Sequence, residues 1–279
     1  MKIEKWEKMN MKKFGKVVVV MMTAVMLLSG CGGTTGGTAE NTESTVGSET
    51  GLLSKIVVGT NAEFPPFEYI DNNGQPDGFD IALIKEVGAR AGFDVEIKNM
   101  DFDALLMSMT TGGVDMVIAG MTASAEREKQ VDFSEPYFDA SQVIIVKEDN
   151  EEITSFADLS GKKVAVQQGT TGDLMITEGD ENCIVEGVEV KRMNKGADAV
   201  LDLMNDGVDA VVIDALPAQE FVDANAGKIK IITDEVAKEE YAIALPKGKD
   251  ELKDAVNKAL EEIKADGTFD SIAEEYGAK

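Results

Sequence analysis

Arg127 and Asp214 are two residues whose charges could together hold a small molecule that carries both an anionic and a cationic group. Arg127 is one of three arginines among 27 basic residues, and a guanidinium can hold a carboxylate through two parallel hydrogen bonds. Asp214 ends the apolar run 208–213, which only Asp209 interrupts. A carboxylate at the end of a buried strand is costly unless it meets a cation. The alternatives are a solvated helical arginine and a solvated strand-end aspartate.

Two hydroxyl groups can support the same chemistry. Thr170 and Thr171 follow Gly169, at the expected start of a helix. Hydroxyls and free backbone N–H groups at such a position can hold a carboxylate. Simple capping of the helix is the other interpretation, and the two roles are compatible.

Strands and helices alternate from Lys55 onward, which predicts an α/β fold with mainly parallel sheets. In the first block we expect strands at 56–58, 95–97 and 114–119 and helices at 79–91 and 102–111. In the second block we expect strands at 164–166 and 208–213 around a helix at 197–205.

The two blocks share a design. Gly113-Val114-Asp115 and Gly207-Val208-Asp209 each join a helix to a buried strand. The chain then ends in two amphipathic helices, at 252–263 and 269–276, which complete the first block only if the chain returns to it. The sequence therefore predicts two similar lobes, the second inserted into the first.

Ligands of open α/β sheets bind outside the carboxyl ends of the strands. Applied to both lobes, this rule places four segments at one cleft, namely 61–64, 119–122, 167–171 and Asp214.

Composition excludes many other functions. The chain has no histidine, so it cannot build a Ser-His-Asp triad, a Cys-His nucleophile pair or a histidine-ligated zinc site. Its 52 acidic residues give a net charge of −25, which repels nucleic acid. The sequence also lacks a Walker loop, a dinucleotide fingerprint and a Cys/His cluster, so we expect no cofactor and no metal.

The amino terminus has the pattern of an export signal. Lys12, Lys13 and Lys16 directly precede the short apolar run 17–28. Leu28-Ser29-Gly30-Cys31 resembles the lipobox of bacterial lipoproteins, in which the cysteine is diacylated. We expect a signal peptide at 1–30, a lipidated Cys31 and a flexible tether at 31–52, rich in Gly, Thr, Ser and Glu. The start codon stays open between Met1, Met9 and Met11.

The chain from Ile56 to Gly277 resembles the polar amino-acid family of solute-binding proteins of bacterial ABC transporters. Six motifs carry the resemblance in the family's order: Thr60-Asn61-Ala62-Glu63-Phe64-Pro65-Pro66-Phe67-Glu68, Gly78-Phe79-Asp80-Ile81, Ala119-Gly120-Met121-Thr122 with Arg127, Val131-Asp132-Phe133-Ser134-Glu135-Pro136-Tyr137, Gln168-Gly169-Thr170-Thr171 and Ala265-Asp266-Gly267-Thr268-Phe269.

This resemblance implies a two-lobed Venus-flytrap fold and a protein that delivers an L-amino acid to a permease. In the family pattern Arg127 matches the residue that clamps the ligand carboxylate, and Asp214 matches the one that binds its ammonium. Thr122 and the Gly120 carbonyl would share the ammonium, and Phe64 and Phe102 would sandwich the side chain. The candidate ligand-binding residues are Asn61, Phe64, Phe102, Ala119, Gly120, Thr122, Arg127, Gln167, Thr170, Thr171 and Asp214.

The ligand's side chain is left open. Relatives that bind basic amino acids often carry an acid at the end of the first strand, where this chain has Asn61, and the second lobe has Gln167 there. Two neutral amides favour a polar, uncharged ligand such as glutamine or cystine. Glu63 would favour a basic ligand if it pointed inward, and at the rim it would be surface charge.

The resemblance also implies lobes at 53–142 with 240–279 and at 143–239, joined by two crossings near 140–141 and 237–241. We expect an extracytoplasmic monomer, anchored to the cell membrane through lipid. Two other interpretations remain: an exported dehydratase for arogenate or prephenate, with Glu63 as general acid, and an amino-acid sensor domain. A sensor domain would be expected to continue into a transmembrane helix and a signalling domain, and we do not expect these here.

Overall fold

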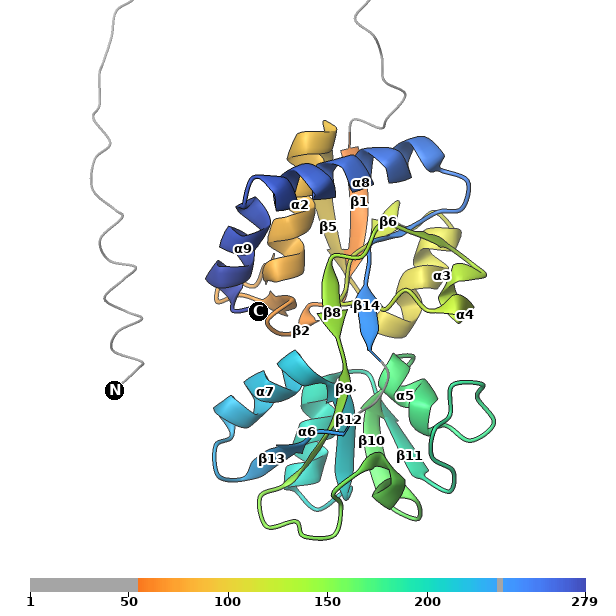
Figure 1. Cartoon of the computed structure of the whole chain (residues 1–279), viewed down its shortest axis with the longest axis vertical. Coiled ribbons are helices and arrows are strands. Elements are labelled where there is room, and N and C mark those ends of the chain that lie inside the picture. The colour runs from red at the N-terminus through yellow and green to blue at the C-terminus, as the bar shows by residue number, and fades with distance from the viewer. Residues whose placement is uncertain (1–54, 235–237) are drawn as a thin grey trace, which may run out of the picture. The chain divides into compact units, whose positions relative to one another are not determined.

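The computed structural model of the chain describes residues 55–234 and 238–279. The expected signal peptide, the tether and Cys31 lie outside these residues. The described part is an α/β protein of two lobes, each built on a five-stranded sheet (Figure 1).

The first sheet is mainly parallel. Its strands run in the order β5 (Asp94–Asn99), β1 (Lys55–Thr60), β6 (Met116–Val117), β15 (Ala244–Leu245) and β7 (Asp132–Phe133). β5, β1 and β6 are parallel, and β15 is antiparallel to both of its neighbours. Because β15 comes from the end of the chain, the polypeptide returns to the first lobe after building the second.

Helices cover both faces of the first sheet (Figure 1). One face packs against α2 (Phe79–Ala91), α8 (Asp250–Ala265) and α9 (Thr268–Tyr276), and the other packs against α3 (Leu105–Thr110). The short helix α4 (Ala125–Glu128) follows the end of β6. Gly78 precedes α2 with a φ of 126°, and a Cβ atom there would lie 2.3 Å from the carbonyl oxygen of Phe67. Only glycine therefore allows α2 to begin so close to the strand it packs against.

The second sheet repeats the arrangement. Its strands run in the order β11 (Glu189–Met193), β10 (Lys163–Gln167), β12 (Ala210–Asp214), β9 (Gln142–Lys147) and β13 (Ile229–Ile232). The helical elements of this lobe are η2 (Phe156–Leu159), α5 (Thr171–Ile176), α6 (Gly196–Met204) and α7 (Ala215–Ala224). β11, β10 and β12 are parallel, so their carboxyl ends meet at one edge of the sheet.

Two small sheets lie near the junction of the lobes. β8 (Phe138–Ala140) pairs antiparallel with β14 (Glu239–Tyr241), and both strands cross between the lobes. A hairpin of β2 (Glu63–Phe64), β3 (Glu68–Ile70) and β4 (Pro76–Asp77) follows β1. In this hairpin Phe64 is paired with Glu68.

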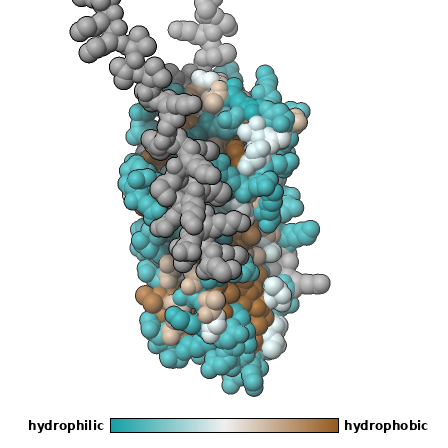
Figure 2. Space-filling view, turned by 90° about the vertical axis from the view of Figure 1, so that its left-hand side faces the viewer, coloured by the Kyte–Doolittle hydropathy of each residue, from teal (hydrophilic) through white to brown (hydrophobic). Residues whose placement is uncertain are grey.

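The elements expected from the sequence are present, with two differences. The helix expected at 102–111 divides into the 3₁₀ turn η1 (Phe102–Ala104) and α3. The strand expected at 114–119 pairs only over Met116–Val117, where it reaches β1 and β15. Within 55–234 and 238–279, the helices are all too short or too polar to cross a membrane. Figure 2 shows hydrophilic residues over much of one face, in keeping with the acidic composition.

Candidate functional site

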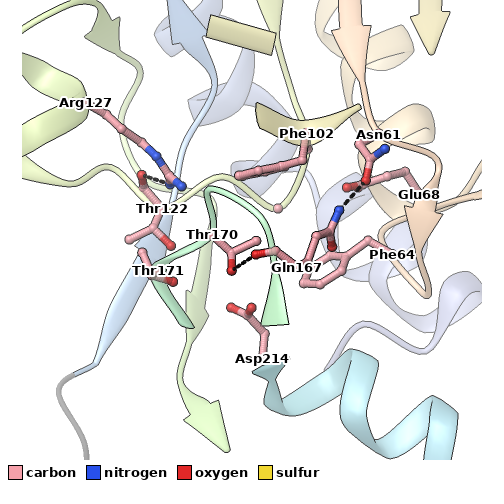
Figure 3. A pocket seen from close by; sticks show the side chains of 12 residues that line it. Asn61, Phe64, Glu68, Phe102, Thr122, Arg127, Gln167, Thr170, Thr171 and Asp214 are labelled. Atoms are coloured by element: carbon pink, nitrogen blue, oxygen red, sulfur yellow. Dashed lines mark hydrogen bonds between the residues drawn. The ribbon is translucent and has the colours of Figure 1, made fainter. Parts of the chain in front are cut away.

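A cavity with an empty volume of about 300 Å³ lies between the carboxyl ends of the two sheets (Figure 3). Residues of both lobes line it, and all eleven candidates from the sequence are among them. The lining residues are Asn61, Phe64, Glu68, Phe102, Ala119, Gly120, Thr122, Arg127, Gln167, Thr170, Thr171 and Asp214.

Arg127 lies at one end of the cavity and contacts both lobes. The Ser124 hydroxyl accepts a hydrogen bond from the Arg127 backbone N–H and caps α4. The guanidinium Nη1 donates to the carbonyl of Thr122 at 2.8 Å, and Nη2 donates to the carbonyl of Gly169 at 3.1 Å. Its central carbon lies 5.3 Å from the centroid of the Phe102 ring. Burial lowers the pKa of Arg127 to about 10, so the side chain stays charged at neutral pH.

Asp214 ends β12 and is 6% exposed. Its Oδ1 atom accepts a hydrogen bond of 2.7 Å from the hydroxyl of Tyr241. Burial, together with the negative charge of Glu239, raises the pKa of Asp214 to about 7. A buried carboxyl in this state favours a cation as its partner.

Thr122 and Thr171 face each other from the two lobes. Both hydroxyls donate to the Oε2 atom of Glu239, at 2.6 and 2.8 Å. Glu239 lies on β14 and does not line the cavity. The pair of hydroxyls therefore converges on a single carboxylate oxygen.

The remaining residues of this end are held by the backbone. Thr170 caps α5, its hydroxyl accepting from the backbone N–H of Asp173. The N–H of Gly120 donates to Asp80 at 2.8 Å. A Cβ atom on Gly120 would lie 2.9 Å from the ring of Phe64, and its φ of 50° also favours glycine.

The other end of the cavity holds amides and a carboxyl group (Figure 3). The Nε2 atom of Gln167 donates to Oδ1 of Asn61 at 2.8 Å, and Nδ2 of Asn61 donates to the carbonyl of Met100 at 2.8 Å. Both amides are buried. The two strand ends thus meet through their side chains at this end.

Glu68 is the lining residue that the sequence analysis missed. It is fully buried, and neither of its carboxylate oxygens has a hydrogen-bond partner. Burial raises the pKa of Glu68 well above its ordinary value, and the charges of Asp80 and Asp214 add to the rise. Glu68 reaches the cavity because it is paired with Phe64, and this pairing puts both side chains on one face of the hairpin.

Glu63, which the sequence left undecided, does not line the cavity. Its Oε1 atom lies 2.6 Å from Nζ of Lys195 in the other lobe. Two further pairs join the lobes nearby: Gln168 donates to Asp103 at 2.6 Å, and Asn194 donates to Asp101 at 3.3 Å. We call these three contacts the rim pairs.

The cavity therefore presents a guanidinium at one end, a carboxyl group at Asp214, and a second carboxyl group at the far end. The part of the chain that the structure describes contains no group of three or more Asp, Glu or Cys side chains placed to hold a metal ion. This arrangement of charges suits an extended molecule with an anionic end and one or two cationic groups.

Comparison with known proteins adds a family and its members. The family described as bacterial extracellular solute-binding proteins, family 3, matches residues 56–279. The arginine-binding extracellular protein ArtP of Bacillus subtilis (strain 168) is 34% identical over 234 residues, which are 84% of this chain and 89% of the relative. The L-cystine-binding protein TcyJ of Escherichia coli (strain K12) is 30% identical over 236 residues, 82% of this chain and 87% of the relative. A solved structure, an ancestral arginine-binding protein bound to glutamine, is 44% identical, with a TM-score of 0.76 over 82% of this chain and 100% of that chain.

Proposed function

Because this chain belongs to family 3 of the bacterial extracellular solute-binding proteins, we propose that it binds one polar L-amino acid between its lobes, preferably one with a cationic side chain. The observation that carries this proposal is the order of charges along the cavity. Arg127 lies at one end, Glu68 at the other, and Asp214 lines the same cavity (Figure 3).

The ligand carboxylate binds at Arg127. The guanidinium is buried, charged, and held by the carbonyls of Thr122 and Gly169. Each of the hydroxyls of Thr122 and Thr171 has one proton and donates it to Glu239, so either hydroxyl would have to leave Glu239 to hold the ligand carboxylate. Charge-assisted hydrogen bonds of this kind are the strong ones.

The ligand ammonium binds at Asp214. This carboxyl group is buried beside Tyr241, whose hydroxyl donates to it. Burial disfavours the charged form of Asp214, and an ammonium group beside it would stabilise that form. Gly120 and Thr122 also line the cavity, and the carbonyl of the first and the hydroxyl of the second can share the ammonium.

The ligand side chain extends between Phe64 and Phe102 toward Asn61, Gln167 and Glu68. A guanidinium or ammonium group at Glu68 would pair a carboxyl whose neighbour is the Asp80 carboxyl and not a cation. A neutral amide at this place would use only Asn61 and Gln167, which already bond to each other. One relative is named for arginine, which has a cationic side chain, and one similar structure is bound to glutamine, which has a neutral one. Both kinds of side chain are therefore candidates for the ligand.

Binding without turnover accounts for the cavity better than catalysis does. The general acid that a dehydratase would use was expected at Glu63, and this carboxylate is paired with Lys195 outside the cavity. Family members of known name are binding proteins of transport systems.

Delivery to a permease depends on closure of the lobes. The rim pairs join residues of the two lobes, and β8 with β14 forms the crossing about which they can move. We place the hinge there, between a first lobe at 53–142 with 240–279 and a second lobe at 143–239. We further propose a monomer, exported by residues 1–30 and anchored through lipid on Cys31, whose closed form an ABC permease recognises.

A thermal-shift screen of the twenty amino acids and cystine tests the proposal. A ligand at 100 times its dissociation constant adds about 2.7 kcal/mol to the free energy of unfolding. Arginine or lysine should give the largest shift, and aspartate and glutamate none. A shift by none of these compounds would overturn the function, and a larger shift with glutamine or cystine would overturn only the preference for a cation.

A further inference from the structure

Buried acidic groups outnumber buried basic groups in and beside the cavity. Glu68, Asp80 and Asp214 are at most 6% exposed, while Arg127 is the only buried cation in 55–234 and 238–279. An unpaired buried charge is so costly that a carboxyl group in such surroundings takes up a proton instead. At least one of these three groups must therefore be neutral when the cavity holds no ligand.

Glu68 and Asp80 are neighbouring carboxyl groups, and their hydrogen bonds decide which of the two holds a proton. Oδ2 of Asp80 accepts from the hydroxyl of Tyr137 and from the N–H of Gly120, each at 2.8 Å. Donors of this kind stabilise the charged form of a carboxyl group. Neither oxygen of Glu68 accepts from such a donor, and the group beside it is the carboxyl of Asp80, to which a protonated Glu68 can donate. Asp80 is thus the better anion of the two, and the proton belongs on Glu68.

Resting on the function proposed above, we infer that Glu68 keeps its proton in the empty cavity and with a neutral ligand, and releases it when a cationic side chain binds. The O–H bond of the carboxyl group breaks, the proton passes to water and buffer, and the carboxylate pairs with the incoming cation. One positive charge enters as one leaves, so the net charge of the cavity is unchanged. The pH then sets the preference between cationic and neutral ligands.

Other groups that face Glu68 have separate effects. Asp80 comes from α2, Asp214 from the end of β12, and Tyr137 from the segment between β7 and β8. Burial raises the pKa of Tyr137 well above its ordinary value, so this hydroxyl stays neutral. Asp214, with a pKa raised to about 7 by burial, also loses a proton when a ligand ammonium binds. That release is common to every α-amino acid and does not depend on the ligand's side chain.

A matched pair of ligands therefore isolates Glu68. L-citrulline has the shape of L-arginine, with a neutral ureido group in place of the guanidinium. Calorimetric titration of the protein with each ligand, in buffers of different ionisation enthalpy, counts the protons released. Arginine should release up to about one proton more than citrulline. Its affinity relative to citrulline should rise with pH, by up to about tenfold per unit on the acid side of the Glu68 titration.

Two variants complete the test. Glu68→Gln fixes the side chain in a neutral form, so the difference in released protons should vanish and the ratio of affinities should no longer change with pH. Glu63→Gln removes a carboxylate from the rim and should leave both quantities as in the parent. The parent protein alone suffices if Glu68→Gln does not fold, because the proton count is made without it.

Equal proton release by arginine and citrulline in the parent would overturn the inference. So would a difference that persists in Glu68→Gln, or binding of citrulline without binding of arginine at any pH. These outcomes all leave an amino-acid-binding protein in place. Only a failure of every amino acid to bind would overturn the proposed function itself.

Discussion

The Nε2 atom of Gln167 donates a 2.8 Å hydrogen bond to Oδ1 of Asn61, so the ends of β10 and β1 meet across the cavity through one pair of amides. From the sequence, both amides were expected to face the ligand's side chain. Both do line the cavity, but they bind each other as well. Because Gln167 is the donor and Asn61 the acceptor of this bond, an acidic substitution should affect ligand binding differently at the two positions.

Asn61→Asp should increase the preference for arginine over glutamine. The new carboxylate can still accept from Nε2 of Gln167, and it adds negative charge to the end of the cavity that holds Glu68. It also loses the hydrogen bond to the carbonyl of Met100, so both affinities should fall while their ratio changes. Gln167→Glu should weaken binding of both ligands, because the new carboxylate cannot donate to Oδ1 of Asn61. Two buried acceptors would then face each other without a donor. Competition binding of the two amino acids measures each ratio, and an unchanged ratio in Asn61→Asp would show that this position does not sense the ligand's charge.

Arg127→Ala should weaken binding by roughly thirty-fold to several-thousand-fold, because loss of one partner of a desolvated ion pair costs about 2–5 kcal/mol. Arg127→Lys should recover only part of this loss, since an ammonium cannot form two parallel bonds to a carboxylate. Arg90→Ala is the control, because Arg90 pairs with Glu86 and Asp266 on the first lobe, outside the cavity. Calorimetry measures all three, and a change below threefold in Arg127→Ala would place the carboxylate clamp elsewhere.

Lys195→Ala should speed ligand dissociation by about two- to fivefold, because exposed ion pairs contribute little and this one joins the lobes only in the closed form. The effect should shrink as salt is added. Lys55→Ala provides the comparison, since Lys55 pairs with Glu96 within the first lobe. Stopped-flow measurement of ligand dissociation tests this. Equal dissociation rates in the two variants would show that the Lys195–Glu63 pair does not help to hold the lobes closed.

The ligand-free protein should lose stability as pH rises from about 4 to about 8. Burial raises the pKa of Asp80 to about 6 and that of Asp214 to about 7, from an ordinary value of 3.8. In this range the folded chain holds protons that the unfolded chain has released, so the free energy of unfolding falls with increasing pH. Asp214→Asn should flatten the slope, and the exposed Asp223→Asn should not. Urea denaturation at several pH values gives the slope, and a slope of opposite sign would contradict the prediction.

Cys31→Ser should release the protein from the membrane and leave ligand affinity unchanged. Cys31 lies outside the described residues, and the expected tether at 31–52 separates it from the cavity residues. Detergent-phase partitioning of the parent and the variant measures anchoring. Identical partitioning of the two proteins would refute the lipid anchor.

Much of the site could be read from the sequence because it follows a rule of topology. The ends of parallel strands carry Asn61, Ala119, Gln167 and Asp214, and runs of apolar residues mark those strands clearly. The family assignment, drawn from motifs distributed along the chain, is confirmed. The roles of the lining residues in binding remain predictions.

Glu68 and Glu239 could not be found in this way. Glu68 faces the cavity because of its pairing with Phe64 in a hairpin whose strands are too short to show an alternating pattern. Glu239 lies on the returning strand β14, and its contact with Thr122 and Thr171 depends on how the lobes come together. Neither position follows from the ends of parallel strands. Tertiary pairing, and not local sequence, brings both carboxylates to the site.

The central claim is that one L-amino acid lies along the cavity with its carboxylate at Arg127 and its side chain toward Glu68. Titration of the protein with L-arginine and with agmatine, which lacks only the α-carboxylate, tests it most directly. The account predicts that arginine binds and that agmatine binds at least about thirty-fold more weakly, since it leaves the buried guanidinium without its partner. Equal binding of the two compounds, or no binding of arginine, would contradict it.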